Sequence, residues 1–158
     1  MRFLFVLLIL AACPASAMKL DDTLSPLQNI DMQVDWQHKN RMDELSEDQL
    51  NALEARFTNY EVRLNTASHV GQHVRIYLGL PVNIRGLNDP AALRLGWTTR
   101  SHFLDGTVTP GTRALLFDGL VNSAVLVDIL DFTLEIDGRA FSAPINFEPD
   151  YEIEIITP

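Results

Sequence analysis

The feature that most constrains the fold of this chain is a series of short segments in which apolar and polar residues alternate. Residues 60–65, 74–80, 93–97 and 151–156 follow this pattern. A period of two places successive side chains on opposite faces of a strand, so each segment is typical of a strand with one buried face. No strand–helix–strand alternation occurs along the chain, and a parallel α/β sheet is therefore not expected.

Turn-forming residues separate these segments at intervals of roughly ten to twenty residues. Glycine accepts positive φ and aspartate can bond its own backbone, so such residues favour tight reversals. The loop at residues 68–71 is also expected to join strands 60–64 and 74–80 as a hairpin. The pattern predicts a mainly β chain, an antiparallel β-sandwich (immunoglobulin-like or open-barrel-like) of about 7–9 strands. The other predicted turns are Thr109-Pro110-Gly111-Thr112, Asp105-Gly106, Asp118-Gly119 and Asp137-Gly138.

One amphipathic helix is predicted over residues 47–57. Ser46 can cap its first turn, and Gln49, three residues later, can reach back to the Ser46 backbone as in a capping box. Apolar residues then follow at spacings of three and four, which would give the helix one narrow stripe for docking on the domain. The stripe consists of Leu50, Leu53 and Phe57.

Residues 18–45 form a lead-in to the domain and contain an amphipathic strand over about residues 30–37. Polar residues alternate there with four apolar ones. Such a strand can complete its own sheet, or it can add to the edge of a neighbouring sheet by main-chain pairing. The four apolar residues of this candidate interaction strand are Ile30, Met32, Val34 and Trp36.

The first seventeen residues have the layout of an export signal. Arg2 supplies a positive charge, Phe3 to Ala12 form an apolar run, and Ala15-Ser16-Ala17 supplies small residues for cleavage. The run is too short to span a bilayer. We therefore expect residues 1–17 to be a signal peptide and residues 18–158 to be a single exported bacterial domain. Cleavage would remove one basic residue and no acidic residue, which changes the formal net charge from −9 to −10.

The single cysteine, Cys13, offers an alternative to free release. Leu10-Ala11-Ala12-Cys13 resembles the lipobox at which bacterial lipoproteins are cut and lipidated. Lipidation at Cys13 would anchor the domain to the outer or inner membrane, whereas cleavage after Ala17 would release it to the periplasm or the cell surface. In both cases the mature domain has no second cysteine for an internal disulfide and depends on packing for its stability.

Composition and charge exclude several functions. A hydrophobic content of 47% is too high for a disordered acidic tail. The excess of 21 acidic over 12 basic residues argues against a nucleic-acid partner, because that affinity depends on basic side chains that neutralise phosphates. The sequence also has no Gly-x-Ser-x-Gly motif and no glycine-rich phosphate loop, and we expect no cofactor.

His69 and His73 form a candidate metal site. Imidazoles four residues apart can share one side of a helix, but Gly71 and the neighbouring strand pattern indicate a turn. No nearby carboxylate or cysteine completes a ligand set. A pair of surface histidines in a loop is the competing interpretation.

Asp128 interrupts an apolar run over residues 124–136. A carboxyl group in that setting is the candidate for a perturbed, raised pKa, and together with Asp131 or Glu135 it could form the acid pair of a hydrolase. The competing interpretation is that Asp128 accepts hydrogen bonds from backbone groups at a β-bulge.

Caps, turns and outward strand faces account for nearly every polar residue, which is unlike an enzyme. The leading hypothesis is therefore an exported, non-enzymatic interaction or structural module of the bacterial cell envelope, such as a subunit or assembly factor, that acts through its sheet edges. Its partner would be an envelope protein or a second copy of the chain. One alternative is a periplasmic β-sandwich that binds a metal, or a small ligand between Tyr77, Trp97 and Phe103. Another is a hydrolase built on Asp128.

Overall fold

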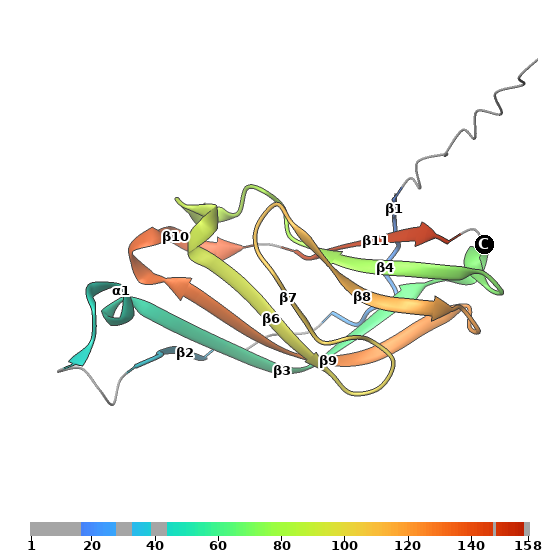
Figure 1. Cartoon of the computed structure of the whole chain (residues 1–158), viewed down its shortest axis with the longest axis horizontal. Helices are drawn as coiled ribbons and strands as arrows, with labels where there is room; N and C mark the ends of the chain where they lie inside the picture. The colour runs from blue at the N-terminus through green and yellow to red at the C-terminus, as the bar shows by residue number, and fades with distance from the viewer. Residues whose placement is uncertain (1–16, 28–32, 39–43, 147, 157–158) are drawn as a thin grey trace, which may run out of the picture.

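The computed structural model describes residues 17–27, 33–38, 44–146 and 148–156, and within them the chain is mainly β. The helical segments are short: α1 (Glu47–Leu50) and the 3-10 turns η2 (Ala67–His69), η3 (Pro90–Ala92) and η4 (Gly138–Ala140). The two longest strands, β3 and β9, run side by side through the molecule (Figure 1). The strands are β1 (Met18–Lys19), β2 (Gln33–Trp36), β3 (Ala52–Asn65), β4 (His73–Gly79), β5 (Arg85–Leu87), β6 (Leu93–Thr99), β7 (Gly106–Val108), β8 (Arg113–Leu120), β9 (Val125–Asp137), β10 (Phe141–Asn146) and β11 (Asp150–Ile155).

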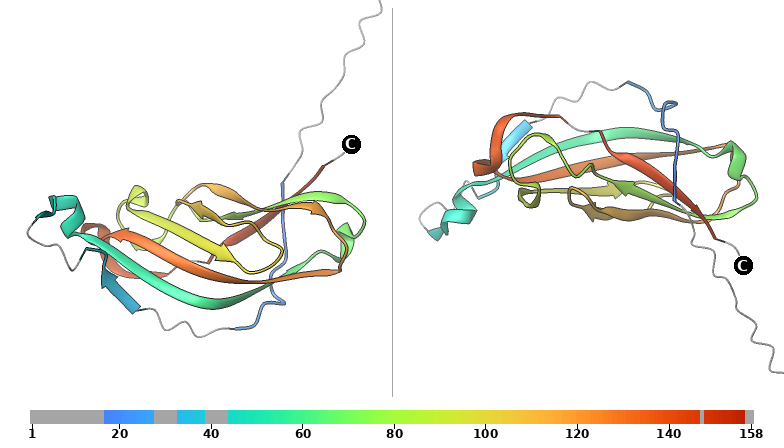
Figure 2. Two further views of the ribbon diagram at one scale, coloured as in Figure 1. Left: turned by 60° about the horizontal axis from the view of Figure 1, so that its bottom comes forward. Right: turned by 90° about the horizontal axis from the view of Figure 1, so that it is seen from above.

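The strands of the described chain form open antiparallel sheets in a sandwich-like arrangement, which confirms the mainly β class. The described chain has eleven strands, however, more than the seven to nine predicted, because several short strands of two to four residues pair at sheet edges. One sheet has the order β2-β3-β9-β6-β7, and the other large sheet has the order β1-β11-β4-β8. β5 and β10 form a separate two-stranded ribbon. Figure 2 shows the sheets from two further sides.

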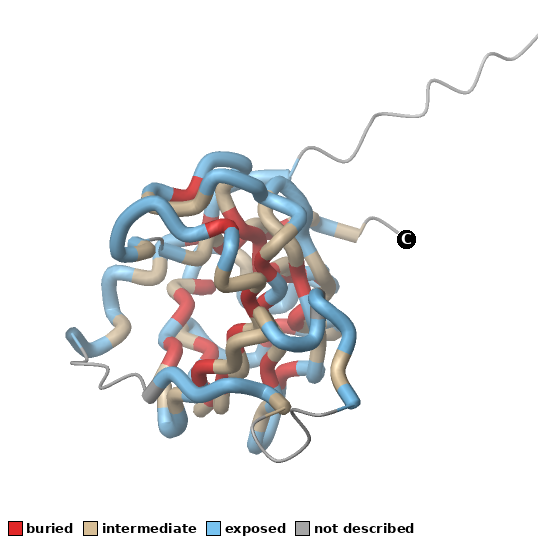
Figure 3. Tube along the Cα trace, turned by 90° about the vertical axis from the view of Figure 1, so that its left-hand side faces the viewer, coloured by how far each residue is buried: buried red, intermediate tan, exposed pale blue. Residues whose placement is uncertain are grey.

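The apolar faces of the two large sheets contribute to one core. Val74, Ile76 and Leu78 of β4 are fully buried, whereas Arg75 between them is exposed. Val62 of β3 is likewise fully buried. The buried positions gather toward the middle of the molecule (Figure 3). The predicted alternation of faces is therefore confirmed for these strands.

The predicted helix over residues 47–57 is wrong beyond its first turn. Gln49 does reach back, since its Oε1 accepts the backbone N–H of Ser46 at 3.0 Å. The helix ends at Leu50, however, and residues 52–57 form the start of β3. β3 pairs with β9 along nearly its whole length, and one turn of helix has too few hydrogen bonds to compete with such a ladder.

The predicted hairpin between residues 60–64 and 74–80 does not form. β3 lies in the five-stranded sheet and β4 in the four-stranded sheet, so the chain crosses between the sheets through η2. Thr66 secures this crossing. It is fully buried, its hydroxyl donates to the Ser123 carbonyl at 2.8 Å, and its N–H donates to the Ala124 carbonyl at 2.8 Å.

The turn predicted at residues 109–112 is confirmed. The N–H of Thr112 donates to the Thr109 carbonyl at 3.0 Å, and Gly111 has a φ of 76°. Proline followed by a residue of positive φ is the arrangement of a type II turn. The chain also turns after β9, where Asp137 accepts the N–H of Arg139 at 3.0 Å.

The turn predicted at Asp118-Gly119 is wrong, because both residues lie within β8. They pair there with Arg75 and Val74 of β4. Asp118 accepts a hydrogen bond from the Arg75 side chain at 2.9 Å instead of bonding its own backbone. Asp118 therefore forms a cross-strand hydrogen bond within the sheet and not the local hydrogen bond of a turn.

The lead-in before β2 ties the two large sheets together. β1 pairs with β11, and Leu20, which is buried, donates its N–H to β11. The carbonyl of Asp21 then accepts the N–H of Asn65 at 2.8 Å, and the hydroxyl of Ser25 accepts the N–H of Arg63 at 2.9 Å, both on β3. The lead-in thus completes edges of its own domain.

Candidate functional site

β2 contains most of the described part of the candidate interaction strand and is one of the two edge strands of the five-stranded sheet, β7 being the other. All four of its residues pair with β3. Gln37 continues this ladder, since its N–H donates to the Ala52 carbonyl at 2.9 Å. Hydrogen-bonding directions alternate along an antiparallel strand, so the N–H and C=O groups of Val34 and Trp36 point away from β3.

The apolar side of β2 is less buried than predicted. Val34 and Trp36 share a sheet face with the buried Ala55 of β3, which is the core face. Val34 is nevertheless 52% exposed and Trp36 is 48% exposed, because the opposing sheet does not cover this strand. Ile30 and Met32, the other two predicted members, lie outside the described residues.

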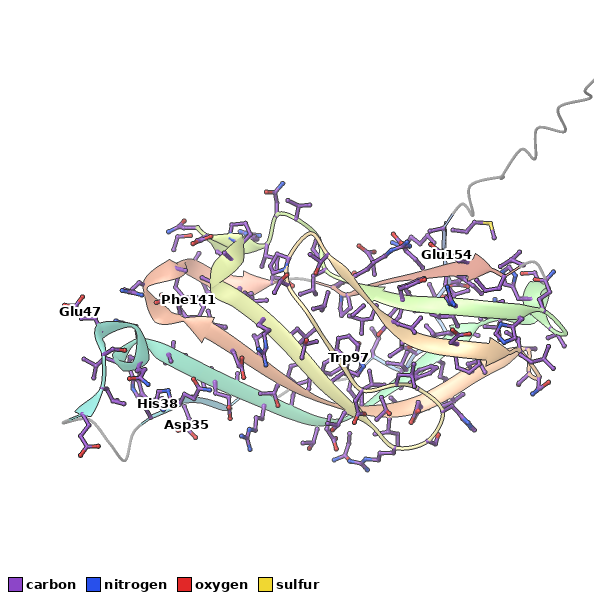
Figure 4. All side chains as sticks on the ribbon, in the orientation of Figure 1. Asp35, His38, Glu47, Trp97, Phe141 and Glu154 are labelled. Carbon is purple, nitrogen blue, oxygen red and sulfur yellow. The ribbon has the colours of Figure 1, made fainter. Side chains whose placement is uncertain are left out.

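Two acidic residues lie at the same end of the molecule as this exposed strand. Asp35, His38 and Glu47 lie at the same end of the molecule, far from Glu154 at the other end (Figure 4). In the sequence, residues 31–50 hold six carboxylates and two basic side chains. β2 therefore combines half-exposed apolar side chains with a position inside an acidic stretch of the sequence.

Asp128 lies on the buried face of β9 and is only 3% exposed. Its carboxylate accepts backbone N–H groups from the loop between β6 and β7 and from its own strand. This confirms the interpretation that it bonds backbone groups, although the bulge itself lies in β3, between Phe57 and Tyr60. The donors are Arg100 at 3.3 Å, Ser101 at 3.1 Å, His102 at 2.7 Å, Phe103 at 2.8 Å and Ile129 at 2.7 Å.

The pKa of Asp128 is lowered, not raised as predicted. Burial by itself raises the pKa of this carboxyl, but the N–H groups of Phe103, Ile129, His102 and Arg100 outweigh burial by stabilising the ionised form. An ionised, buried carboxylate that is engaged by backbone donors has no proton to give to a leaving group. Its geometry is that of an anchor for the loop.

The other carboxylates of β9 do not converge on Asp128. Asp131 and Glu135 lie on the opposite face of the strand. Asp131 binds the Arg100 guanidinium through both oxygens at 3.0 Å and accepts the backbone N–H of Asn59 at 2.8 Å. Asn59, a non-glycine residue within the β3 bulge, has a positive φ of 61°. Asp131 therefore holds this bulge and does not form an acid pair with Asp128.

The two histidines of the candidate metal site have separate partners. His69 Nδ1 lies 3.0 Å from the Gln72 side-chain oxygen, and His73 Nδ1 lies 3.7 Å from Asp118 Oδ1. Among the residues that the structure describes, no group of three or more histidine, cysteine or acidic side chains could hold a metal ion. A metal at His69 and His73 stays a prediction.

Tyr77, Trp97 and Phe103 do not line a common cleft. Trp97 and Phe103 belong to the core, and the Trp97 indole N–H donates to the Leu104 carbonyl at 2.8 Å. Tyr77 lies on the outer face of the other sheet. Its hydroxyl donates to Glu154 at 3.0 Å, and an arginine guanidinium stacks over its ring.

Sequence reasoning missed a hollow of about 500 Å³ on the outer face of the five-stranded sheet. Small and hydroxylated residues form its floor, and charged residues stand around them. The sequence pattern does assign these residues to the outward faces of their strands. It does not show that they lie next to one another, because that depends on the register of four strands. The floor includes Gly96, Thr98, Thr107 and Thr133.

The free energy of unfolding is expected to fall as the pH drops below about 4. The folded-state pKa of Asp128 is lowered from 3.8. The stability contributed by its ionised form is therefore fully present above the unfolded pKa and is lost as the pH falls through the folded pKa. Urea denaturation across this range measures the effect. Asp128→Asn should show a flatter dependence on pH, and equal slopes for both proteins would contradict this role of Asp128.

No family model, curated protein sequence or solved structure matches the chain. Among the described helices, none is both long enough and apolar enough to cross a membrane.

Proposed function

We propose that the chain is an exported, non-enzymatic binding module that captures an extended segment of a cell-envelope protein at the edge of β2. The observation that carries this proposal is an edge strand that, among the residues the structure describes, pairs with β3 alone and carries half-exposed apolar side chains. The outward backbone groups of Val34 and Trp36 could pair with an added strand. Their half-exposed side chains could pack against it.

Apart from its short length, this edge lacks the devices that protect most sheet edges. Natural edge strands are commonly blunted by proline, by lysine, by a bulge or by a covering loop. β2 is short, at four residues, but it contains no proline or lysine, and it has no register shift against β3. At the other end of β3, the lead-in covers the edge through Ser25 and Asp21. The edge is therefore covered by the lead-in near Arg63 and Asn65 of β3 and is formed by β2 near the start of β3, and this contrast supports an interaction at β2.

Charge favours one kind of occupant over the other. The chain has a formal net charge of −9, and six carboxylates against two basic side chains flank β2 in residues 31–50. A second copy would bring a chain of the same negative net charge to the edge. A segment that alternates apolar and basic residues would instead match the two apolar side chains and neutralise the acidic setting. The proposed partner is therefore a basic strand of another protein.

Export rests on the predicted signal peptide over residues 1–17, and anchoring rests on Cys13, both of which lie outside the described residues except for Ala17. We also propose an immunoglobulin-like arrangement for the sandwich. It is supported by chain crossings between the large sheets, such as those from β3 to β4 and from β8 to β9.

Val34→Pro is expected to abolish binding at the edge while leaving the domain folded. Proline removes only the Val34 N–H, which points away from β3, so the β2–β3 ladder keeps its hydrogen bonds. The probe is a synthetic peptide of alternating lysine and valine, with binding measured by titration calorimetry and by a blue shift of Trp36 fluorescence. Trp36→Phe identifies the contribution of Trp36 to that signal. Asp35→Pro is the matched control, because its N–H faces β3 and its loss should destabilise β2.

Three outcomes would overturn the proposal. Peptide binding that survives Val34→Pro would place the interaction elsewhere on the chain. If a peptide of the same composition but scrambled order bound as tightly as the alternating peptide, charge alone would explain the binding and strand pairing would not. A wild-type dimer that Val34→Pro dissociates would identify a second copy, and not a basic partner, as the occupant of the edge.

A further inference from the structure

The outer face of the five-stranded sheet carries a row of residues that crosses four neighbouring strands and has small side chains on three of them. In the register of the sheet, Arg56, Thr133, Gly96 and Thr107 stand side by side on β3, β9, β6 and β7, the four strands that lie next to one another in Figure 1. Arg56 stands at one end of this row, and charged side chains also stand on both sides of it, Arg94 and Glu135 on one side and Asp131 on the other. The hollow above it, about 500 Å³, falls in the size range of ligand sites.

Gly96 occupies the middle of this row although the fold does not require glycine there. A Cβ at this position would lie 3.6 Å from Thr107 Cγ2 and 3.7 Å from the Thr133 carbonyl oxygen, which are ordinary contacts. Its φ is not positive either. Glycine in a strand interior weakens the strand, and it commonly marks a place where a ligand approaches the backbone closely. The bare backbone at Gly96 thus has a cost to the sheet and no structural benefit.

The hydroxyl groups beside Gly96 are available to a ligand. Those of Thr98, Thr107 and Thr133 make no hydrogen bond within the part of the chain that the structure describes. Each hydroxyl can both donate and accept. An apolar ligand would bury these groups without partners, which is unfavourable. The floor therefore favours a ligand that is itself rich in hydrogen-bonding groups.

The charged groups around the row balance one another. Arg56 pairs with Glu54 at 2.5 Å, and Arg94 pairs with Glu135 at 3.2 Å. Asp131, at the far side of the hollow, is bound by Arg100. An anionic ligand would have to displace a carboxylate from its arginine, and a cation would have to displace an arginine. This local balance contrasts with the net charge of −9 and favours a neutral ligand.

We infer that this row is a binding site for a neutral oligosaccharide, lying across β3, β9, β6 and β7. Such a chain presents donors and acceptors to the threonine hydroxyls and to the paired arginines and carboxylates, and it can approach the bare backbone at Gly96. Neighbouring strands lie about 4.8 Å apart, which is close to the length of one pyranose unit. A second hollow, about 360 Å³, also has Arg94 and Glu135 in its wall, so the path continues beyond the row. The site is independent of the β2 edge.

Gly96→Val and Thr133→Val test this inference. The valine at position 96 fills the middle of the row, and the valine at position 133 keeps the shape of threonine but removes its hydroxyl. The probe is an array of neutral gluco-, manno-, galacto- and N-acetylhexosamine oligosaccharides, followed by titration calorimetry with the strongest binder. We expect at least a roughly tenfold loss of affinity for Gly96→Val, and roughly threefold to tenfold for Thr133→Val, equivalent to one lost hydrogen bond.

Thermal unfolding shows whether each variant is folded, and Gly96→Val should be at least as stable as wild type because valine favours strands. Val34→Pro should bind the oligosaccharide normally, which separates this site from the proposed function. Absence of binding to every neutral glycan on the array would overturn the inference. So would binding that Gly96→Val and Thr133→Val leave unchanged, or preferential binding of peptides or charged glycans at this face.

Discussion

Asp128→Ala is expected to lower the free energy of unfolding by about 3–5 kcal/mol. The substitution removes the acceptor of the backbone N–H groups of Ser101, His102 and Phe103, in a loop whose Phe103 side chain is 5% exposed. Each buried polar group left without a partner costs about 1–3 kcal/mol. The loop also contains the carbonyl that binds Trp97, so its loosening should reach the core. Urea denaturation near neutral pH measures the loss.

Asp89→Ala is the matched control for this prediction. Asp89 also accepts a backbone N–H, that of Ala91 at 2.9 Å, but it does so at an exposed 3-10 turn. Its removal should cost about 1 kcal/mol or less. Asp128→Asn retains the size of the side chain but replaces one acceptor oxygen by an N–H₂ group that would face other donors, and we expect a loss between those of the two alanine variants. Equal stability of Asp128→Ala and Asp89→Ala would contradict this prediction, because it would mean that the loop N–H groups do not depend on the Asp128 carboxylate.

Gly106→Val is expected to destabilise the domain by about 3 kcal/mol, the upper part of the range for overpacking. A Cβ at this position would lie 2.5 Å from the ring of Trp97, which no real contact permits. The ring cannot move aside easily, because Trp97 is 3% exposed and its indole N–H is bound to the Leu104 carbonyl at 2.8 Å. Thermal and urea unfolding measure the effect, and near-ultraviolet circular dichroism reports the packing of Trp97.

Gly96→Val provides the matched comparison, because the same substitution is made on the adjacent strand, one register pair away. The Cβ there would make only ordinary contacts, at 3.6 Å and beyond. We expect Gly96→Val to be neutral or stabilising and Gly106→Val to be strongly destabilising. Equal effects at both positions would mean that strand propensity, and not contact with Trp97, decides the cost.

The faces of the strands could be predicted from the sequence because alternation is a local property. Val74, Ile76 and Leu78 were assigned to the inward face from their spacing, and all three are fully buried. The turn at residues 109–112 could be predicted for the same reason, since proline and glycine restrict their own backbone angles. The exposure of Val34 and Trp36 could not, because it depends on how far the opposing sheet extends.

The wrong predictions came from local sequence patterns that are compatible with two different secondary structures. The capping residues Ser46 and Gln49 do start a helix, but the residues that follow also alternate, and β9 supplies a partner for them. The polar loop at residues 68–71 suits a hairpin as well as a crossing between sheets. The row through Gly96 could not be predicted for a different reason, because it exists only where four strands align in one register.

By itself, the sequence determined that the chain is mainly β, which side chains of most strands face inward, and where several of the turns lie. The tertiary structure alone decided that β3 pairs with β9 and not with β4, and that residues 52–57 are strand. It also decided that Asp128 is an ionised anchor, because the donors of its hydrogen bonds lie on a loop distant in the chain. The physical reason is that a period of two fixes the face of a side chain but not the strand beside it. Burial, pKa and binding surfaces all depend on that neighbouring strand.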